Sequence, residues 1–263
     1  MTGVFLAVAV VGGVGLFIGL FLGVAAIWFK VKVDEKEEAV LGVLPGNNCG
    51  GCGYPGCSGL AAAIAKGEAA VNACPVGGEP VGKLVAEIMG VEEQSTTRMT
   101  AYVQCQGDCD KITLDYDYTG IEDCRMLSFV PNGGAKSCNY GCLGYGTCAK
   151  VCQFDAIHVV NGVAVVDKDK CKACGKCVDL CPKHLISLIP YDAKYTVACN
   201  SNDKGPVTMK DCTVGCIGCQ LCKKNCPASA VKIKDFNATI DYSKCEGCGI
   251  CKEKCPRGSI VEH

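Results

Sequence analysis

Two cysteine runs near the C-terminus have the spacing of iron–sulfur ligands. Each run has the form C-x2-C-x2-C-x3-C and is followed by proline; the residues are Cys216, Cys219, Cys222 and Cys226, then Cys245, Cys248, Cys251 and Cys255. In such a run three thiolates surround one cubane, and the fourth cysteine ligates the neighbouring cluster. The spacing therefore predicts two [4Fe-4S] clusters, one on Cys216, Cys219, Cys222 and Cys255 and one on Cys226, Cys245, Cys248 and Cys251. Zinc is the alternative, although structural zinc sites normally use two separated C-x2-C pairs.

The same pattern occurs a second time upstream. Eight cysteines have a counterpart 74 residues later: Cys138, Cys142, Cys148, Cys152, Cys171, Cys174, Cys177 and Cys181. A constant offset of this kind indicates an internal duplication. The first copy departs from the pattern because Tyr145 stands where the second copy has Cys219, and Gln153 replaces the proline. With Cys138 as the nearest substitute ligand, we predict one cluster on Cys138, Cys142, Cys148 and Cys181 and another on Cys152, Cys171, Cys174 and Cys177.

A different cysteine arrangement lies nearer the N-terminus. It has the spacing C-x2-C-x4-C-x16-C and comprises Cys49, Cys52, Cys57 and Cys74. Glycines between these cysteines allow the backbone to turn tightly around an inorganic cluster. The segment therefore predicts a fifth [4Fe-4S] site between two short helices, near Leu60–Ala65 and Val81–Met89. Zinc is a more serious alternative here, because this spacing is less diagnostic.

Five clusters use 20 of the 25 cysteines and leave Cys105, Cys109, Cys124, Cys199 and Cys212. Cys105, Cys109 and Cys124 would supply three ligands of a sixth cluster, completed by Cys138, Cys199 or another group. The alternative is that these are buried, inert thiols. Cys199 and Cys212 are interpreted as relics of the duplication.

The composition points to electron transfer rather than to other functions. The chain has a formal net charge of −1 and no Lys/Arg run, which argues against nucleic-acid binding. Dinucleotide and P-loop motifs are absent, and the three histidines lie apart in the sequence. A cubane held by four thiolates has no open coordination position, so it passes electrons without bond chemistry. The sequence therefore predicts a relay of clusters.

The first segment has the composition of a membrane span. Residues 3–29 carry no charge, and about 20 such residues cross a bilayer core as a helix. A cleaved signal peptide is the alternative, but no basic residue precedes the run. Lys30 and Lys32 follow it, so the positive-inside rule predicts that the remainder lies in the cytoplasm.

The elements that must position the cysteines form an α+β fold. Apolar residues alternate in 156–167 around Asn161-Gly162, and 230–241 repeats the pattern, so each copy contains a predicted hairpin. We expect six segments: a transmembrane helix (1–29), a linker (30–44), a small α-helical [4Fe-4S] domain (45–92), a cysteine-containing connecting segment (93–136), and two ferredoxin-like di-cluster domains (137–190 and 191–263).

On these features the chain resembles the B subunit of the Rnf complexes, which are ion-pumping ferredoxin:NAD+ oxidoreductases. The resemblance rests on one N-terminal span, the loop Cys49-Gly50-Gly51-Cys52-Gly53-Tyr54-Pro55-Gly56-Cys57 with Cys74-Pro75, and the ferredoxin repeats. It covers the whole chain and is closer to the longer form with two repeats.

This resemblance implies a single-pass subunit of a redox-driven Na+ or H+ translocase in the inner (cytoplasmic) membrane. Reduced ferredoxin would be the electron donor, subunits A and E the acceptors, and subunits C, D and G further partners. The N-terminal cluster would be the exit and the ferredoxin-like copies the entry. Two alternatives stay open: a polyferredoxin-type subunit of another membrane hydrogenase or dehydrogenase, and a metal-storage or zinc protein without electron transfer.

Overall fold

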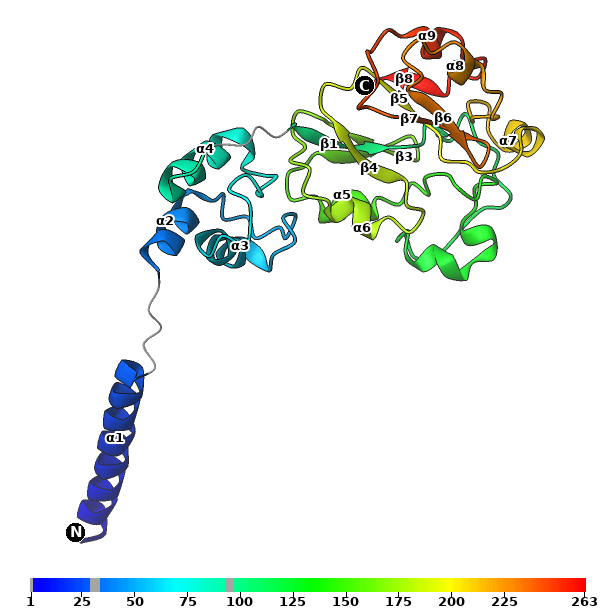
Figure 1. The fold of residues 1–263 in the computed structure, drawn as a ribbon. Helices are drawn as coiled ribbons and strands as arrows, with labels where there is room; N and C mark the ends of the chain where they lie inside the picture. Colours follow the sequence, from blue (N-terminus) through cyan, green and yellow to red (C-terminus); the bar gives the residue numbers. More distant parts are fainter. Residues whose placement is uncertain (1, 29–33, 93–96) are drawn as a thin grey trace.

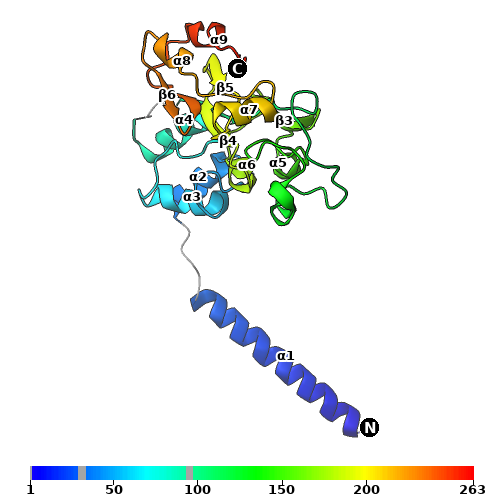
Figure 2. The same cartoon turned by 90° about the vertical axis from the view of Figure 1, so that its right-hand side faces the viewer.

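The N-terminal helix stands apart from the other elements. The computed structural model describes residues 2–28, 34–92 and 97–263. Helix α1 (Thr2–Trp28) lies away from the remaining elements in both views (Figure 1, Figure 2). Among the described residues no helix has the length and apolarity needed to cross a bilayer, so the predicted transmembrane helix is not supported. Phe29, Lys30 and Lys32, which that prediction used, lie outside the described residues.

A small helical domain follows. Its helices are α2 (Glu35–Val43), α3 (Gly56–Ala65) and α4 (Gly78–Met89). Asp34 caps α2 by accepting a 3.0 Å hydrogen bond from the backbone of Lys36. The side chains of Val40, Leu60, Ile64 and Val85 are fully buried between the helices. Each such burial stabilises the fold by about 1.5–3 kcal/mol. The two helices predicted around this cysteine loop are therefore present, and α2 lies in the segment predicted as a linker.

The first ferredoxin-like unit, called unit 1 (residues 97–190), begins upstream of the predicted boundary at residue 137. Its elements are β1 (Met99–Val103), η1 (Met126–Phe129), η2 (Pro131–Gly133), α5 (Thr147–Val151), β2 (Ile157–Val160), β3 (Val163–Val166), α6 (Lys176–Leu180) and β4 (Ile186–Pro190). β1 lies inside the segment predicted as a connection, yet it pairs antiparallel with β4, the last strand of the unit.

The second unit, called unit 2 (residues 191–263), repeats this plan. Its elements are β5 (Tyr195–Val197), α7 (Gly205–Asp211), α8 (Leu221–Lys224), β6 (Val231–Lys234), β7 (Asn237–Ile240), α9 (Ile250–Glu253) and β8 (Ile260–Glu262). β5 pairs antiparallel with β8, and β6 pairs with β7 as β2 pairs with β3. The two units pack together, with unit 2 coloured yellow to red in Figure 1. The predicted mixture of α and β structure is confirmed.

The two predicted hairpins are present and support the cysteine loops. Asn161 and Gly162 both have positive φ, as does the pair Asp235 and Phe236 in unit 2, which suits two-residue hairpin turns. A glycine in each cysteine loop packs on the turn of its unit. A Cβ atom on Gly144 would lie 2.6 Å from the Gly162 carbonyl oxygen, and one on Gly218 would lie 2.8 Å from that of Phe236. Glycine is therefore required at both places.

Candidate iron–sulfur centres

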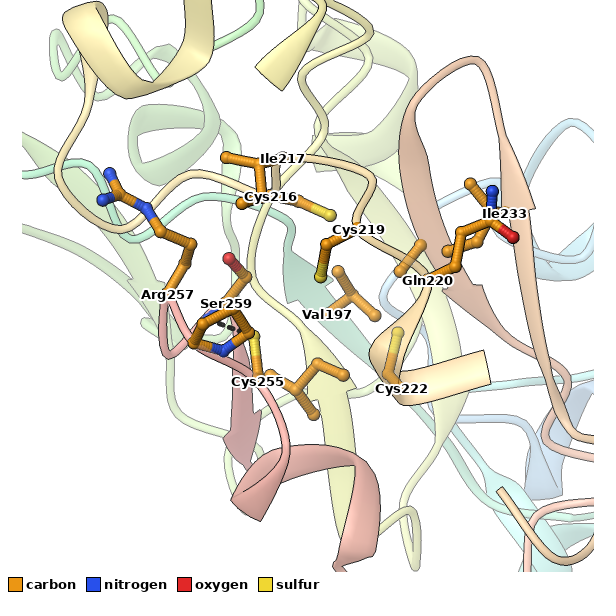
Figure 3. A pocket seen from close by; sticks show the side chains of 13 residues that line it. Val197, Cys216, Ile217, Cys219, Gln220, Cys222, Ile233, Cys255, Arg257 and Ser259 are labelled. Atoms are coloured by element: carbon orange, nitrogen blue, oxygen red, sulfur yellow. Dashed lines mark hydrogen bonds between the residues drawn. The ribbon is translucent and has the colours of Figure 1, made fainter. Parts of the chain in front are cut away.

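Unit 2 has two cavities that are each lined by four cysteines. We call the first site 2a; its cysteines are Cys216, Cys219, Cys222 and Cys255. Figure 3 shows these side chains pointing toward one another from the loop before α8, from α8 and from the segment after α9. Val197, Ile233 and Ile260 form apolar walls. The second cavity, site 2b, is lined by Cys226, Cys245, Cys248 and Cys251. Both sets are those expected from the exchange of the fourth ligand.

Unit 1 also has two such cavities. Site 1b is lined by Cys152, Cys171, Cys174 and Cys177, the set predicted from the sequence. Site 1a is lined by Cys124, Cys142, Cys148 and Cys181. Three of these four were predicted, but Cys124 takes the place expected for Cys138.

The correction at site 1a has a structural cause. Between Cys105 and Cys138 the chain is longer by 20 residues than between their counterparts Cys199 and Cys212. This insertion carries Cys124 to the start of α5, where its backbone N–H donates to the Thr147 hydroxyl at 2.9 Å. Tyr145, at the position of the missing ligand, packs edge-on against Tyr118 at a ring separation of 5.7 Å. A distant cysteine therefore occupies the position that Tyr145 leaves without a thiol.

The cysteines predicted to form the N-terminal site are Cys49, Cys52, Cys57 and Cys74. Cys52, Cys57 and Cys74 pack against the core of the helical domain. The side chain of Asn48 accepts a 2.8 Å hydrogen bond from the backbone N–H of Cys57 and so holds the loop at the start of α3. Burial raises the pKa of Cys74, and the charges of Cys57 and Cys49 raise it further. These thiols therefore lie within electrostatic reach of one another.

The last cysteine of each run accepts the same backbone hydrogen bond. In every case the donor is the N–H of the residue four positions later, at 3.3–3.5 Å from the sulfur; the acceptors are Cys152, Cys181, Cys226 and Cys255. Donors aimed at sulfur stabilise thiolate charge and help to set the potential of a bound cluster. The two units therefore share this detail at all four sites.

The electrostatics of the thiols suit a metal cluster. Burial raises the pKa of Cys177 to about 12, and the charges of Cys171 and Cys174 contribute. Burial likewise raises the pKa of Cys222 to about 11, with a contribution from Cys216. Clustered buried thiolates need compensating positive charge, which cluster iron supplies. Within the described ranges no three His, Cys, Asp or Glu side chains are arranged to hold a single metal ion.

The cysteines left over in the sequence are divided differently from the prediction. Cys105, Cys109 and Cys124 do not form one site, because Cys124 lines site 1a and Cys105 lines a separate cavity with Cys138, Cys199 and Cys212. Cys109 is exposed and hydrogen-bonds through its N–H to Asn161. Cys199 and Cys212 are thus brought together with other cysteines. The number of cysteines was the signal in the sequence for a further four-cysteine set, because 25 cysteines divide into six sets of four with one remaining.

Cavities of this kind, lined by four thiols and repeated along one chain, define an iron–sulfur electron-transfer protein. Three family models match: "Putative Fe-S cluster" at residues 44–76, "4Fe-4S binding domain" at 164–187 and "4Fe-4S dicluster domain" at 215–260. They cover the N-terminal site, part of unit 1 and most of unit 2.

Whole-chain relatives identify the family. The chain is 44% identical over 246 residues to the B subunit of the Na(+)-translocating ferredoxin:NAD(+) oxidoreductase complex of Acetobacterium woodii, covering 93% of this chain and 74% of the relative. It is 40% identical over 240 residues to the B subunit of the ion-translocating oxidoreductase complex of Methanosarcina acetivorans, covering 91% and 90%. The B subunit of the proton-translocating ferredoxin:NAD(+) oxidoreductase complex of Clostridium ljungdahlii is 40% identical, with 93% and 87% covered. The chain belongs to the family of B subunits of the Rnf-type ion-translocating oxidoreductase complexes.

Proposed function

We propose that this chain is the membrane-attached relay that takes electrons from reduced ferredoxin and passes them to membrane-embedded subunits of an ion-translocating ferredoxin:NAD+ oxidoreductase. The observation that carries the proposal is the series of four-cysteine sites in both units and in the helical domain. The names of the relatives supply the donor and the reaction of the whole complex. The chain itself is an electron carrier within that complex.

Five sites are assigned to [4Fe-4S] clusters: the N-terminal site and sites 1a, 1b, 2a and 2b. A bound cubane with four thiolate ligands supplies one-electron transfer. The chain's own residues bind the iron through thiolates, donate N–H groups to the sulfurs and exclude water with apolar walls. Hydrogen bonding and solvent exclusion are the means by which the protein adjusts a cluster's potential.

The N-terminal site is the proposed exit. A Cβ atom on Gly51 would lie 2.6 Å from the carbonyl oxygen of Cys174, so the cysteine loop touches site 1b directly. Burial raises the pKa of Cys174, and the charge of Cys49 contributes to that shift. The helical domain also follows α1 directly in the chain. An electron at site 1b therefore has a short route toward the end of the molecule that carries α1.

Unit 2 is the proposed entry. Cys219 of site 2a and Cys248 of site 2b are exposed, which allows a donor to approach their clusters closely. Exposed lysines surround both loops, namely Lys223, Lys224, Lys244, Lys252 and Lys254. Positive charge at this place steers an acidic one-electron donor such as ferredoxin.

We also propose that α1 attaches the chain to the inner membrane, with the cluster domains on the cytoplasmic side. α1 carries no charged residue and exposes Phe5, Phe17, Leu20 and Phe21. Apolar side chains presented in this way require a lipid or protein surface.

The test compares membranes from cells that carry the full chain or a form without residues 1–33, after alkaline carbonate washing. Retention of the shortened form at the level of the full chain contradicts the role of α1.

Subunits A and E are the proposed acceptors, with C, D and G as further members of the complex. In the purified complex, Cys52→Ala should leave the clusters of unit 2 reducible by ferredoxin but stop ferredoxin-dependent NAD+ reduction. Cys109→Ala is the matched control, because this exposed thiol belongs to none of the five assigned sites. Undiminished NAD+ reduction in Cys52→Ala rules out the exit site, and failure of ferredoxin to reduce the wild-type chain rules out the relay.

A further inference from the structure

We propose that Cys105, Cys138, Cys199 and Cys212 hold an additional [4Fe-4S] cluster between the two units, and that electrons cross from unit 2 to unit 1 through it. We call these residues the bridge site. The inference rests on the proposed relay, and it adds the connection without which the relay would consist of two separate halves.

The four cysteines line one cavity. Its other lining residues include Ile112, Tyr140, Ser201 and Val214, and none carries a charge. Cys199 is 9% exposed and Cys212 is 8% exposed. The four thiols therefore line one cavity together, as the four thiols of sites 1a and 2a do.

Each unit contributes two ligands by the same construction. Cys105 follows the end of β1 by two residues, and Cys199 follows the end of β5 by two residues. Cys138 and Cys212 each stand four residues before the first cysteine of a cluster loop, Cys142 and Cys216. The bridge site is therefore a symmetric product of the duplication, and it is complete only when both units are present.

Backbone hydrogen bonds hold the two units together beside the bridge site. Ile112 pairs with Cys212 in an antiparallel bridge, and the Thr113 N–H donates to the Asp211 carbonyl at 2.9 Å. The Thr213 N–H donates to the Lys111 carbonyl at 2.8 Å, and the Arg257 guanidinium donates to the Cys212 carbonyl at 2.7 Å. Cys212 is thus held at the seam by hydrogen bonds on both sides.

Hydrogen bonds also join the bridge site to a cluster site in each unit. The sulfur of Cys105 accepts from the N–H of Cys142, a residue of site 1a, at 3.3 Å. The sulfur of Cys199 accepts from the N–H of Cys216, a residue of site 2a, at 3.2 Å. The two connections are equivalent, one within each unit. They give the relay the order 2b, 2a, bridge, 1a, 1b and N-terminal site.

The transfer balances without protons or bond changes. One electron from a low-potential donor such as reduced ferredoxin enters unit 2. Each transfer oxidises the cluster that the electron leaves and reduces the next cluster, in each case by one electron. The four thiolates of the bridge site remain bound throughout, so only an electron passes from unit 2 to unit 1.

The first test counts iron and acid-labile sulfide in the anaerobically purified full chain. Six cubanes contain about 24 iron atoms per chain and five contain about 20. About 24 iron with equal sulfide supports the bridge cluster, whereas about 20 overturns it. About 20 iron together with one zinc assigns the bridge site to zinc and also overturns the proposal, since zinc does not change oxidation state.

The second test uses variants. Cys199→Ala should lose about four iron and four sulfide per chain, while the control Cys109→Ala should lose none. In rapid mixing with reduced ferredoxin, the clusters of unit 2 should be reduced in Cys199→Ala as in the wild type, while those of unit 1 should stay oxidised. If Cys199→Ala does not fold, Cys138→Ala takes its place. This variant removes a ligand that the other unit supplies, and it should give the same result. Full reduction of unit 1 in a folded variant overturns the bridge without affecting the relay, because the Cys52→Ala test is independent of it.

Discussion

Unit 1 and unit 2 build corresponding cluster sites from different parts of the chain. Site 2a takes all four proposed ligands from the repeat itself, whereas site 1a takes Cys124 from an insertion that unit 2 lacks. Around both sites the hairpin, the glycine of the loop and the N–H bond to the last cysteine are the same. The comparison shows that the scaffold fixes where a thiol is needed, while the chain segment that supplies the thiol is free to change.

The units also differ in how much apolar material surrounds their clusters. The buried core of unit 1 contains eight apolar residues other than cysteine, among them Val103, Ile157 and Leu185. That of unit 2 contains four: Val197, Val231, Ala238 and Ile260. Unit 2 therefore depends more on its clusters for stability.

Removal of iron should have the largest effect of any change considered. Because ligation energy and folding energy are shared in small metal domains, chelation under oxidising conditions should unfold both units. Unit 2 should unfold first, and the helical domain with its own core should retain more structure. Amide hydrogen exchange measures this order: β6 and β7 should lose protection before β2 and β3. Equal loss in both units would show that the size of the apolar core does not matter.

Exchange of a ligand tests the comparison at site 1a. Cys124→Ala should lose up to about four iron per chain, as Cys219→Ala should at site 2a. Tyr145→Cys places a thiol where unit 2 has Cys219. The double variant Cys124→Ala/Tyr145→Cys should therefore regain the lost iron. Iron analysis and the spectrum of the reduced cluster provide the measurement, and a double variant as poor in iron as Cys124→Ala would show that the two loops are not equivalent.

The sequence predicts some of these ligands because they are local. In C-x2-C-x2-C three thiols surround one point whatever the remainder of the chain does, so the cysteines expected at sites 1b, 2a and 2b line those cavities. The roles of Cys124 and of the bridge-site cysteines are not predicted from local spacing, because their positions depend on tertiary contacts. Cys105 and Cys199 are placed by the pairing of β1 with β4 and of β5 with β8. These strands are short and separated by the whole unit, so their partners cannot be read from periodicity.

The loop glycines should give a smaller, matched effect. Gly144→Ala and Gly218→Ala each introduce a methyl group against the hairpin turn, at positions with φ of 83° and 65°. Left-handed strain of this kind costs about 1–3 kcal/mol. Both variants should release iron to a chelator faster than the wild type, each from its own unit. Gly67→Ala is the control: it also has positive φ but no atom within 4 Å of the new Cβ. A control as labile as Gly144→Ala would assign the effect to backbone strain alone rather than to contact with the turn.

The smallest expected effect concerns the hydrogen bond that holds Cys124. Thr147 is 7% exposed, accepts from the Cys124 N–H and donates to the Asp123 carboxylate at 3.1 Å. Thr147→Val keeps the shape but removes the acceptor, which costs about 1 kcal/mol and leaves the Cys124 N–H without its partner. About 1.4 kcal/mol corresponds to a factor of ten in an equilibrium constant, so the smaller loss expected here corresponds to a factor of several. Site 1a should then lose iron several times faster, while its initial iron content should be unchanged.

Unit 2 supplies the control for this last change. The residue equivalent to Thr147 is Leu221, which is exposed and lies in a unit where no inserted ligand needs to be held. Leu221→Val should therefore leave the rate of iron loss from site 2a unchanged. If Thr147→Val and Leu221→Val behave alike, Cys124 is positioned by the packing of the insertion and not by Thr147. If only Thr147→Val accelerates iron loss, a single hydroxyl at the start of α5 is what allows the inserted segment to replace a ligand that the repeat no longer carries.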